Sequence, residues 1–353
     1  MEDDGPLPGW LATVREAGGS DLLLVAGAPP TIRVRGLLQP AAPTVLDSDT
    51  IAASTRAFVP PRLSSAFEGG AAVDLAFSLP ALGRFRMNLH RERGRVAAAI
   101  RALPTSLPTI QGLGFSHDIS LLADLPRGLV LVSGPTGSGK TTTVAAIVAE
   151  LNRLRDGHVI TIEDPVEFEH AHGRSVVEQI EIGVDAESFP VALRSALRQA
   201  PDVIVIGEMR DLESIRIAVS AAETGHLVIA TVHAPDVGGA VSRIADAFPP
   251  ERQNTIRQEL AMGLSAVLTQ SLLRGVEGQM VPAGELLVVS YGARQHIRKN
   301  ALQNLHQEMT STRKLGSFTL EESLARLVRS GRIDRATASL RAAHAEELEL
   351  LLS

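Results

Sequence analysis

Residues 129–143 read Leu-Val-Leu-Val-Ser-Gly-Pro-Thr-Gly-Ser-Gly-Lys-Thr-Thr-Thr. The first four residues are apolar and predict a buried strand, and apolar residues at helical spacing predict a helix over 142–154. Between them, residues 134–141 follow the order G-x-x-x-x-G-K-[ST]. A strand, a glycine-rich loop and a helix form the context of a phosphate-binding loop, so this stretch predicts a site for a nucleoside triphosphate.

The residue types in this loop suit a bound anion. Glycines let backbone N–H groups turn toward a phosphate without Cβ clashes, and the helix start adds the positive end of its dipole. Lys140 supplies a positive charge for the outer phosphates, and Thr141 supplies a hydroxyl for Mg²⁺. The expected nucleotide-binding residues are Gly134, Pro135, Thr136, Gly137, Ser138, Gly139, Lys140, Thr141 and Thr142.

The composition limits the classes of protein and partner. With 353 residues, 44% hydrophobic and 21% charged, the chain has an ordinary globular balance and a length that suits about two domains. The net charge of −6 lacks the basic excess of nucleic-acid-binding proteins, so we expect no nucleic-acid partner. The absence of cysteine excludes disulfides and thiolate metal sites and suits the cytoplasm. The acidic N-terminus is unlike a signal peptide, and no apolar run approaches the ~18 residues of a membrane span.

Two domains are predicted, joined by a proline-containing linker. Residues 1–103 predict a small α+β domain, and residues 104–118 predict a stiff connection. Residues 119–353 predict a nucleotide-binding core. In the first domain, the expected strands are 20–25, 31–34, 72–78, 84–89 and 96–100, and the expected helices are 10–18 and 47–58.

The core predicts a doubly wound α/β fold. Its strands are nearly continuous runs of Val, Ile and Leu, as in parallel sheets covered on both faces. The expected strands are 129–133, 159–163, 203–207 and 227–232, and the helices between them are 142–154, 189–199 and 213–224. Beyond residue 250 the chain predicts helices over 251–273, 292–305, 319–330 and 334–350, with a single strand over 284–289. Thr319 and Glu322 have the spacing of a capping box.

Two carboxylates follow core strands at the edge where ligands bind. Glu163 ends the second strand, where it can face the phosphate loop and activate a water molecule. From this segment alone, a strand-ending turn at Asp164-Pro165 is an equally good interpretation. Glu208 follows an apolar strand in the manner of a Walker B element, which holds Mg²⁺ through its carboxylate or a bound water. We therefore expect Thr141 and Glu208 on the metal side of the site.

Histidines and arginines supply further candidates. His226 and His233 bracket the strand 227–232, and a histidine there could sense the terminal phosphate or pass signals between subunits. We count His233 with Lys140, Glu163 and Glu208 as the catalytic candidates. An arginine could reach the nucleotide of a neighbouring subunit, although a solvated or salt-bridged surface position is the alternative for each one. The arginine candidates are Arg84, Arg86, Arg194, Arg198 and Arg210.

Five motifs stand in an order found in one protein family. They are residues 134–143, 161–168 (Thr-Ile-Glu-Asp-Pro-Val-Glu-Phe), 192–202, 207–211 (Gly-Glu-Met-Arg-Asp) and 224–233. In these motifs the chain resembles the ATPases of the type II/IV secretion superfamily, and within them the pilus-retraction (PilT-type) branch. In the terms of that family they are the Walker A loop, the Asp box, an arginine-bearing helix, Walker B and the His box.

The resemblance implies a fold, an activity and partners. It implies a PAS-like α+β N-terminal domain, a RecA-like P-loop core of α/β class and a helical C-terminal part. It implies ATP and Mg²⁺ as cofactors, and a homohexameric motor that powers type IV pilus retraction and twitching motility by pilin depolymerisation. The ring would be cytoplasmic and peripheral at the inner-membrane base of the pilus, held there through the platform protein and the pilin machinery. Glu163 would activate water, and the five arginines would lie near the nucleotide or the neighbouring subunit.

Other functions remain open at this point. Pilus-assembly and type II secretion ATPases share this core but usually carry a longer N-terminal region and a tetracysteine zinc insert, which this chain lacks. Residues 292–299 occupy the place of a segment typical of the retraction branch and match it in part. The alternatives are such an assembly or secretion ATPase, a nucleotide-binding regulator with negligible turnover, and a DNA translocase.

Overall fold

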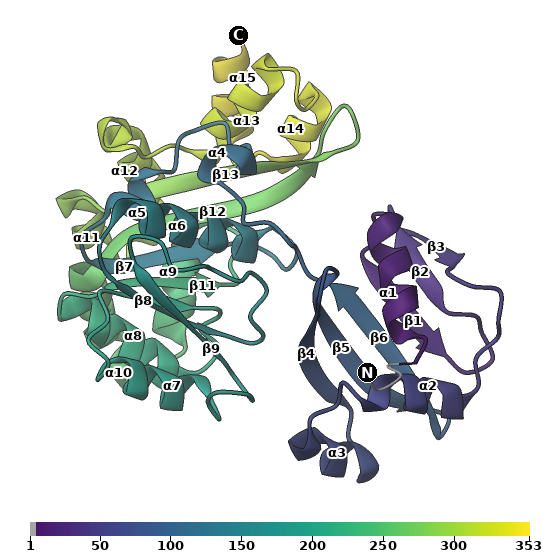
Figure 1. The fold of residues 1–353 in the computed structure, drawn as a ribbon. Coiled ribbons are helices and arrows are strands. Elements are labelled where there is room, and N and C mark those ends of the chain that lie inside the picture. The colour runs from purple at the N-terminus through teal and green to yellow at the C-terminus, as the bar shows by residue number, and fades with distance from the viewer. Residues whose placement is uncertain (1–4) are drawn as a thin grey trace. The chain divides into compact units, whose positions relative to one another are not determined.

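The computed structural model describes residues 5–353, which form two compact units (Figure 1). The smaller unit holds the residues up to 106 together with 165–168. The larger unit holds residues 107–164 and 169–353. The α/β class, the small N-terminal α+β domain and the helical C-terminal part are confirmed. The phosphate loop and the strand ends around it all belong to the larger unit.

The smaller unit is built on a six-stranded antiparallel sheet with the order β3-β2-β1-β6-β5-β4. In β5, Phe85, Met87 and Leu89 are buried and alternate with Arg84 and Arg86, as the sequence predicts. The helix α1 packs its buried Leu7 and Leu11 in the same core. The elements are α1 (Leu7–Glu16), β1 (Asp21–Val25), β2 (Thr31–Val34), β3 (Leu37–Pro40), α2 (Ser48–Arg56), α3 (Pro61–Glu68), β4 (Val73–Leu79), β5 (Gly83–Glu92) and β6 (Arg95–Ala102).

The larger unit has a seven-stranded sheet with the order β13-β12-β7-β11-β10-β8-β9. All neighbours pair in parallel except β12 and β13, which are antiparallel. The strands are β7 (Gly128–Ser133), β8 (His158–Glu163), β9 (Val176–Glu181), β10 (Val203–Ile206), β11 (Leu227–Val232), β12 (Leu264–Arg274) and β13 (Met280–Val288). The strands β3 and β9 and the helix α3 are absent from the sequence-based prediction.

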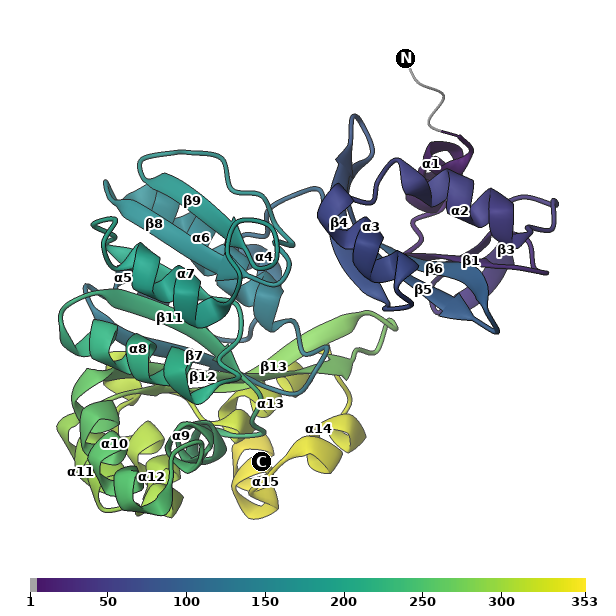
Figure 2. The ribbon, with the colours of Figure 1, turned by 90° about the horizontal axis from the view of Figure 1, so that it is seen from below.

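Helices cover both faces of this sheet (Figure 2). The alternation is clear in β7, where Leu129 and Leu131 pack in one core and Val130 and Val132 in the other. The helices α7 to α10 belong to the first core, and α4 to α6 belong to the second. These helices are α4 (Ile110–Leu113), α5 (Leu121–Asp124), α6 (Lys140–Leu154), α7 (Phe189–Ala196), α8 (Leu212–Glu223), α9 (Val237–Asp246) and α10 (Pro250–Gly263).

The predicted helix over 251–273 is wrong beyond residue 263. The helix α10 ends at Gly263, and residues 264–274 form β12 between β7 and β13. Most of β12 is buried on both faces, so its sequence lacks the polar alternation that marks a half-exposed strand. A buried apolar run of this kind cannot be distinguished from a buried helix by periodicity.

The C-terminal part packs a further group of helices against the antiparallel edge of the sheet. Leu324, Leu327 and Leu348 form a core with Val281 and Ala283 of β13. The capping box at the start of α13 is confirmed. The predicted helix over 334–350 is broken, because residues 342–344 separate α14 from α15. The elements are α11 (Tyr291–Arg298), η1 (Leu302–Asn304), α12 (Leu305–Ser311), η2 (Arg313–Leu315), α13 (Leu320–Arg329), α14 (Arg335–Arg341) and α15 (Ala345–Leu352).

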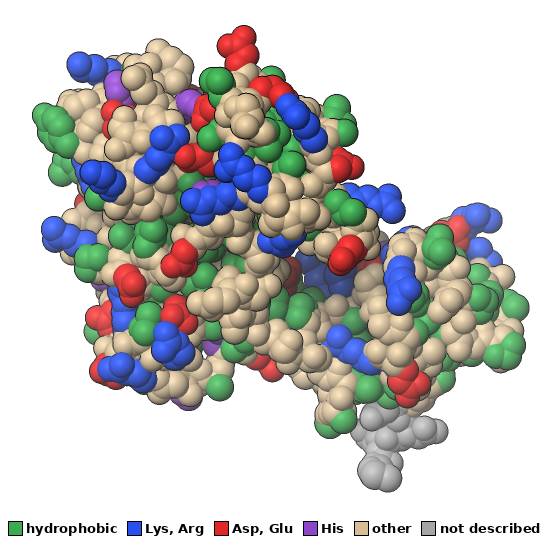
Figure 3. Space-filling model, turned by 90° about the horizontal axis from the view of Figure 1, so that it is seen from above, with side chains coloured by type: hydrophobic (Ala, Val, Ile, Leu, Met, Phe, Trp, Pro, Cys, Tyr) green, Lys and Arg blue, Asp and Glu red, His purple; other side chains and the backbone are tan. Residues whose placement is uncertain are grey.

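The surface carries both signs of charge. On the visible face of the larger unit, Lys and Arg side chains are interspersed with Asp and Glu side chains (Figure 3). Among residues 5–353, no helix has the length and apolar content that crossing a lipid bilayer requires.

A half-buried histidine gives the larger unit a testable acid sensitivity. His117 stacks on Phe318 with 4.1 Å between ring centroids, and burial, with a smaller effect of Arg326, lowers the pKa of His117 to about 4. Unfolded histidine takes up its proton near pH 6.5, whereas folded His117 stays neutral until about pH 4, so His117 lowers the free energy of unfolding progressively as the pH falls from about 6.5 to 4. After a discount for solvent screening, we expect His117 to reduce the free energy of unfolding of the wild type by about 1–2 kcal/mol between pH 7 and pH 4.5. The His117→Phe variant should not show this part of the loss. Denaturant unfolding of the wild type and the variant at the two pH values measures the free energy of unfolding. An equal decrease in both proteins would contradict the prediction.

Candidate functional site

The glycine loop between β7 and α6 has a backbone that only glycine allows. Gly134 has φ of 147°, and a Cβ there would lie 2.2 Å from the carbonyl oxygen of Gln270 and 2.6 Å from Ser138 Oγ. Gly139, at the start of α6, has φ of 87°. The sequence therefore holds the loop tightly against β12 while its N–H groups and the first turn of α6 stay available to an anion.

The loop contains an orphaned polar atom that fits a phosphate ligand. Ser138 is 2% exposed, and its Oγ has no hydrogen-bond partner among residues 5–353. A buried hydroxyl without a partner costs free energy unless a ligand or water satisfies it. Together with the unpaired N–H groups expected in the first turn of α6, this hydroxyl fits a phosphate oxygen. Thr141, the second residue of α6, stands beside them and could present its hydroxyl to a phosphate-bound Mg²⁺.

Lys140 is buried behind the loop. Its Nζ donates to the carbonyl oxygens of Gly134 and Pro135, both at 2.9 Å, and lies 3.3 Å from His233 Nδ1. Burial lowers the pKa of Lys140, and the nearby Glu208 carboxylate opposes that shift. The ammonium group is thus held by weak neutral acceptors that an outer phosphate can replace with a charge-assisted bond.

A chain of polar contacts joins the ends of β7, β10 and β11. His233, just after β11, places Nε2 at 3.1 Å from Glu208 Oε1 while its Nδ1 faces Lys140. Arg210 donates to Glu208 Oε2 at 2.7 Å. Burial alone would raise the pKa of Glu208, but Arg210 and His233 outweigh it and hold that pKa below its usual value. Glu208 is therefore ionised at neutral pH, and an ionised carboxylate is a suitable ligand for Mg²⁺.

Glu163 lies beside this chain of contacts at the end of the neighbouring strand. Ile162 of β8 pairs with Ile206 of β10, so Glu163 and Glu208 extend beyond the same edge of the sheet. Thr161 Oγ1 donates to Glu163 Oε1 at 2.7 Å, and a Cβ on Gly207 would meet the Glu163 Cα at 3.3 Å. These contacts fix the position of a carboxylate at the end of β8, beside the turn that leads to Glu208.

The arginine candidates occupy three environments. Arg210 joins Glu208, as described above, and Arg194 forms an ion pair with Glu213 of α8. The helix α7 ends at Ala196, three residues before the predicted end at 199, so Arg198 lies exposed in the turn that follows. Ala200, the residue before Pro201, has a positive φ of 52°, so the chain has left helical geometry by that position.

Arg84 and Arg86 lie on β5 in the smaller unit. Arg84 Nε donates to the carbonyl oxygen of Val166 at 3.0 Å, and Arg86 lies 3.6 Å from a carboxylate oxygen of Asp74. Val166 belongs to the segment 165–168, which the structure assigns to this smaller unit. The structure thus brings Lys140, His233, Glu208 and Arg210 into one chain of contacts, with Glu163 at the next strand end.

Two site residues escape the sequence analysis. Gln270 of β12 donates from Nε2 to the carbonyl oxygen of Ser138 at 2.7 Å, and Gln179 of β9 donates to Glu163 Oε1 at 3.2 Å. Both lie on strands that the sequence does not reveal. The one available signal is the polar triplet Thr-Gln-Ser at 269–271 inside an apolar run, since a polar group in a buried strand requires a partner.

The Gln270 contact predicts a measurable effect on nucleotide affinity. We expect the Gln270→Ala variant to bind a fluorescent ATP analogue about tenfold more weakly, because loss of one buried hydrogen bond releases the loop at Ser138. The matched control is Gln199→Ala, which removes an exposed amide bonded to Ser195. An equal affinity for Gln270→Ala and the wild type would show that the loop keeps its shape without this contact.

A cavity of about 730 Å³ opens at the opposite, amino end of the parallel strands. It is lined by residues that precede β8, β10 and β11, among them Gly157, Asp202 and His226. His226 therefore lies at the end of β11 opposite to His233. Because ligands of such sheets bind at the carboxyl ends of the strands, we place the nucleotide site at the glycine loop and not in this cavity.

Comparisons with known proteins agree with this geometry. The profile of the family described as "Type II/IV secretion system protein" matches residues 92–346. The chain is 38% identical to the type IV pilus retraction ATPase PilT of Pseudomonas aeruginosa, over 93% of this chain and 95% of that protein. It is 36% identical to a twitching motility protein of Neisseria gonorrhoeae, over 92% and 87% of the two chains. A crystal structure of the pilus retraction motor PilT with bound ADP matches with a TM-score of 0.88 and 38% identity, over 96% and 98% of the chains.

Proposed function

The chain belongs to the Type II/IV secretion system protein family, and from this premise we propose that it is a Mg²⁺-dependent ATPase that powers retraction of a type IV pilus. The observation that carries the proposal is its likeness to a pilus retraction ATPase along nearly the whole length of both chains. The buried Ser138 hydroxyl without a partner and the ordered Lys140, His233 and Glu208 contacts support nucleotide chemistry at the glycine loop.

The residues of the site divide the work of hydrolysis. Lys140 exchanges the carbonyl oxygens of Gly134 and Pro135 for the outer phosphates of ATP. Thr141 and Glu208 would hold Mg²⁺, which would supply positive charge to neutralise the phosphates. The backbone of the loop and the Ser138 hydroxyl orient the phosphates.

Glu163 receives a proton from the attacking water, since it is a fixed carboxylate at the carboxyl end of β8, the edge of the sheet at which ligands bind. His233 bridges Lys140 and Glu208 through its two ring nitrogens and so couples the phosphate side of the site to the metal side. Position and charge support these roles, and a substitution of each residue can test the role proposed for it.

The assembly and its surroundings belong to the same proposal. The chain forms a homohexamer, in which Arg84, Arg86, Arg194, Arg198 or Arg210 completes the site of a neighbouring subunit. The segment 104–118, of which residues 107–118 belong to the larger unit, connects the N-terminal domain to the ATPase core and transmits the motion. The ring is cytoplasmic and meets the inner-membrane base of the pilus through a platform protein.

The experiment joins a biochemical test to a cellular one. Purified protein is expected to turn over ATP with Mg²⁺ as a hexamer by mass in solution, and to stop when EDTA removes the metal. Nucleotide binding without turnover would instead favour a regulator. Deletion of the gene in its host should leave surface pili in place and abolish twitching, whereas loss of the pili themselves would assign the chain to pilus assembly.

A further inference from the structure

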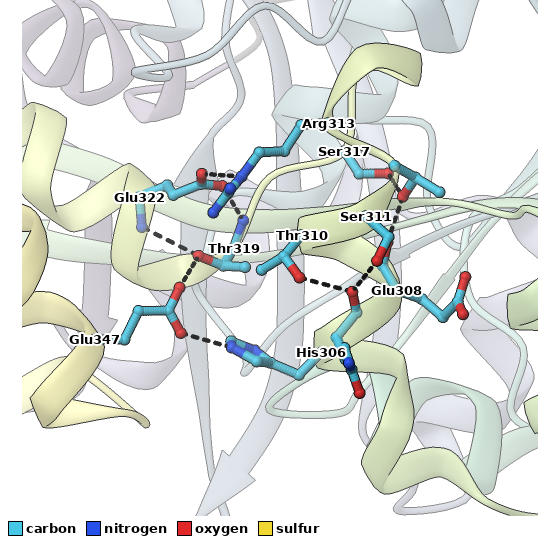
Figure 4. A network of polar contacts seen from close by, with 11 residues as sticks. His306, Glu308, Thr310, Ser311, Arg313, Ser317, Thr319, Glu322 and Glu347 are labelled. Carbon is cyan, nitrogen blue, oxygen red and sulfur yellow. Dashed lines mark hydrogen bonds and ion pairs between the residues drawn. The ribbon is translucent and has the colours of Figure 1, made fainter.

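Three helices of the C-terminal part bring one histidine and two glutamates together. His306 comes from α12, Glu321 from α13 and Glu347 from α15. One ligand atom of each residue lies within 4.8 Å of the ligand atoms of the other two. Figure 4 shows the side chain of Glu347 directed toward His306 and Thr319. None of the three residues takes part in the nucleotide site described above.

The contacts within this cluster leave one oxygen unused. His306 Nε2 lies 2.7 Å from Glu347 Oε2, and Thr319 Oγ1 donates to Glu347 Oε1 at 3.1 Å (Figure 4). Glu321 has no exposed surface, and its Oε1 accepts the backbone N–H groups of Ala343 and His344, both at 2.9 Å. Its second oxygen, Oε2, is buried and has no hydrogen-bond partner among residues 5–353.

The unused oxygen points to a cation. An ionised carboxylate oxygen in a dry interior is costly unless a positive group or a donor satisfies it. A further acidic side chain lies near, because Glu285 of β13 is also buried and interacts electrostatically with both Glu321 and His306. A bound cation would relieve the excess of acidic groups in this part of the interior.

We propose that His306, Glu321 and Glu347 form a binding site for a divalent transition-metal ion that fastens α15 to α12 and α13. One imidazole nitrogen and two carboxylate oxygens form a ligand set that suits Zn²⁺ and its neighbours, whereas Mg²⁺ and Ca²⁺ prefer oxygen alone. His306 Nε2 and Glu347 Oε2 lie 2.7 Å apart. A small increase in this distance would make room for a metal ion with a bond of about 2.0–2.2 Å to each atom.

The position of this site gives the ion a structural role. The helix α15 lies at the end of the described chain and is packed by the buried Leu348 against α13. A metal ion that binds ligands from all three helices would stabilise their packing against β13. The site would then set the stability of the C-terminal part without entering the chemistry of ATP hydrolysis.

The test counts bound zinc in the full-length protein. Protein stripped with EDTA is incubated with Zn²⁺ in the presence of excess Mg²⁺, desalted and analysed for metal content, and its Tm is recorded with and without Zn²⁺. Wild type should retain one more Zn²⁺ per chain than His306→Gln or Glu321→Gln, and its Tm should rise by a few degrees. Glu321→Gln keeps an oxygen that can accept the Ala343 and His344 amides, so it removes charge without removing the acceptor.

A second histidine–glutamate pair supplies the matched control. His296 Nε2 lies 3.5 Å from Glu308 Oε1, and no third acidic ligand accompanies that pair among the described residues. His296→Gln should therefore retain zinc and the Tm rise. Equal zinc content in wild type, His306→Gln and Glu321→Gln would overturn the proposal, and so would loss of zinc from His296→Gln. Neither result bears on ATP turnover, which rests on the separate site at the glycine loop.

Discussion

The Lys140→Ala variant is expected to lose ATP turnover by roughly 10²–10³-fold. Lys140 supplies the positive charge at the glycine-loop end of the chain of contacts that runs through His233 to Glu208, and Arg210 lies at its other end. Its removal takes away the positive charge that meets the outer phosphates, both when ATP binds and when charge moves in the transition state. Steady-state phosphate release with saturating Mg²⁺ measures the effect.

The control for this prediction makes the same chemical change at an exposed position. Lys314 lies in η2 and is exposed to solvent, so Lys314→Ala removes one lysine charge without touching the glycine loop. It should keep turnover within about twofold of wild type, since substitution of an exposed charge far from the glycine loop has a small effect. If Lys140→Ala and Lys314→Ala behave alike, the glycine loop is not the site of hydrolysis.

The parts of this site that the sequence predicts are those that the chain encodes locally. The glycine loop specifies its own backbone and its charge within eight residues, as the positive φ angles of Gly134 and Gly139 illustrate. Glu163 and Glu208 follow apolar strands directly, and adjacent parallel strands bring their ends to one edge. For these residues, local pattern and fold class together were sufficient.

The parts that the sequence misses depend on distant pairing. Gln270 reaches Ser138 across 132 positions of the chain, from a strand whose two buried faces resemble a buried helix. Gln179 reaches Glu163 from the edge strand β9, which carries no clear alternation of polar and apolar residues. The group of His306, Glu321 and Glu347 is likewise formed by the packing of three helices and has no motif spacing.

Glu163→Gln should lower the rate constant kcat by about 10²–10⁴-fold while ATP binding stays close to that of wild type. The amide keeps the size of the carboxylate and an oxygen that can accept the bonds from Thr161 and Gln179. It cannot accept a proton from water, so the chemical step alone is impaired. Lys140→Ala differs, because it weakens binding as well as turnover. Equilibrium binding of a fluorescent ATP analogue beside single-turnover hydrolysis separates the two effects.

Glu178→Gln on the same sheet provides the comparison. Glu178 is exposed on β9, beside Gln179, and pairs with His158 at the other end of β8. The substitution is chemically identical, and we expect a change in kcat of less than about twofold, because an exposed ion pair contributes little. Retention of turnover in Glu163→Gln would assign water activation to another group. Glu208 is then the next carboxylate to substitute, since it lies one strand away and is ionised.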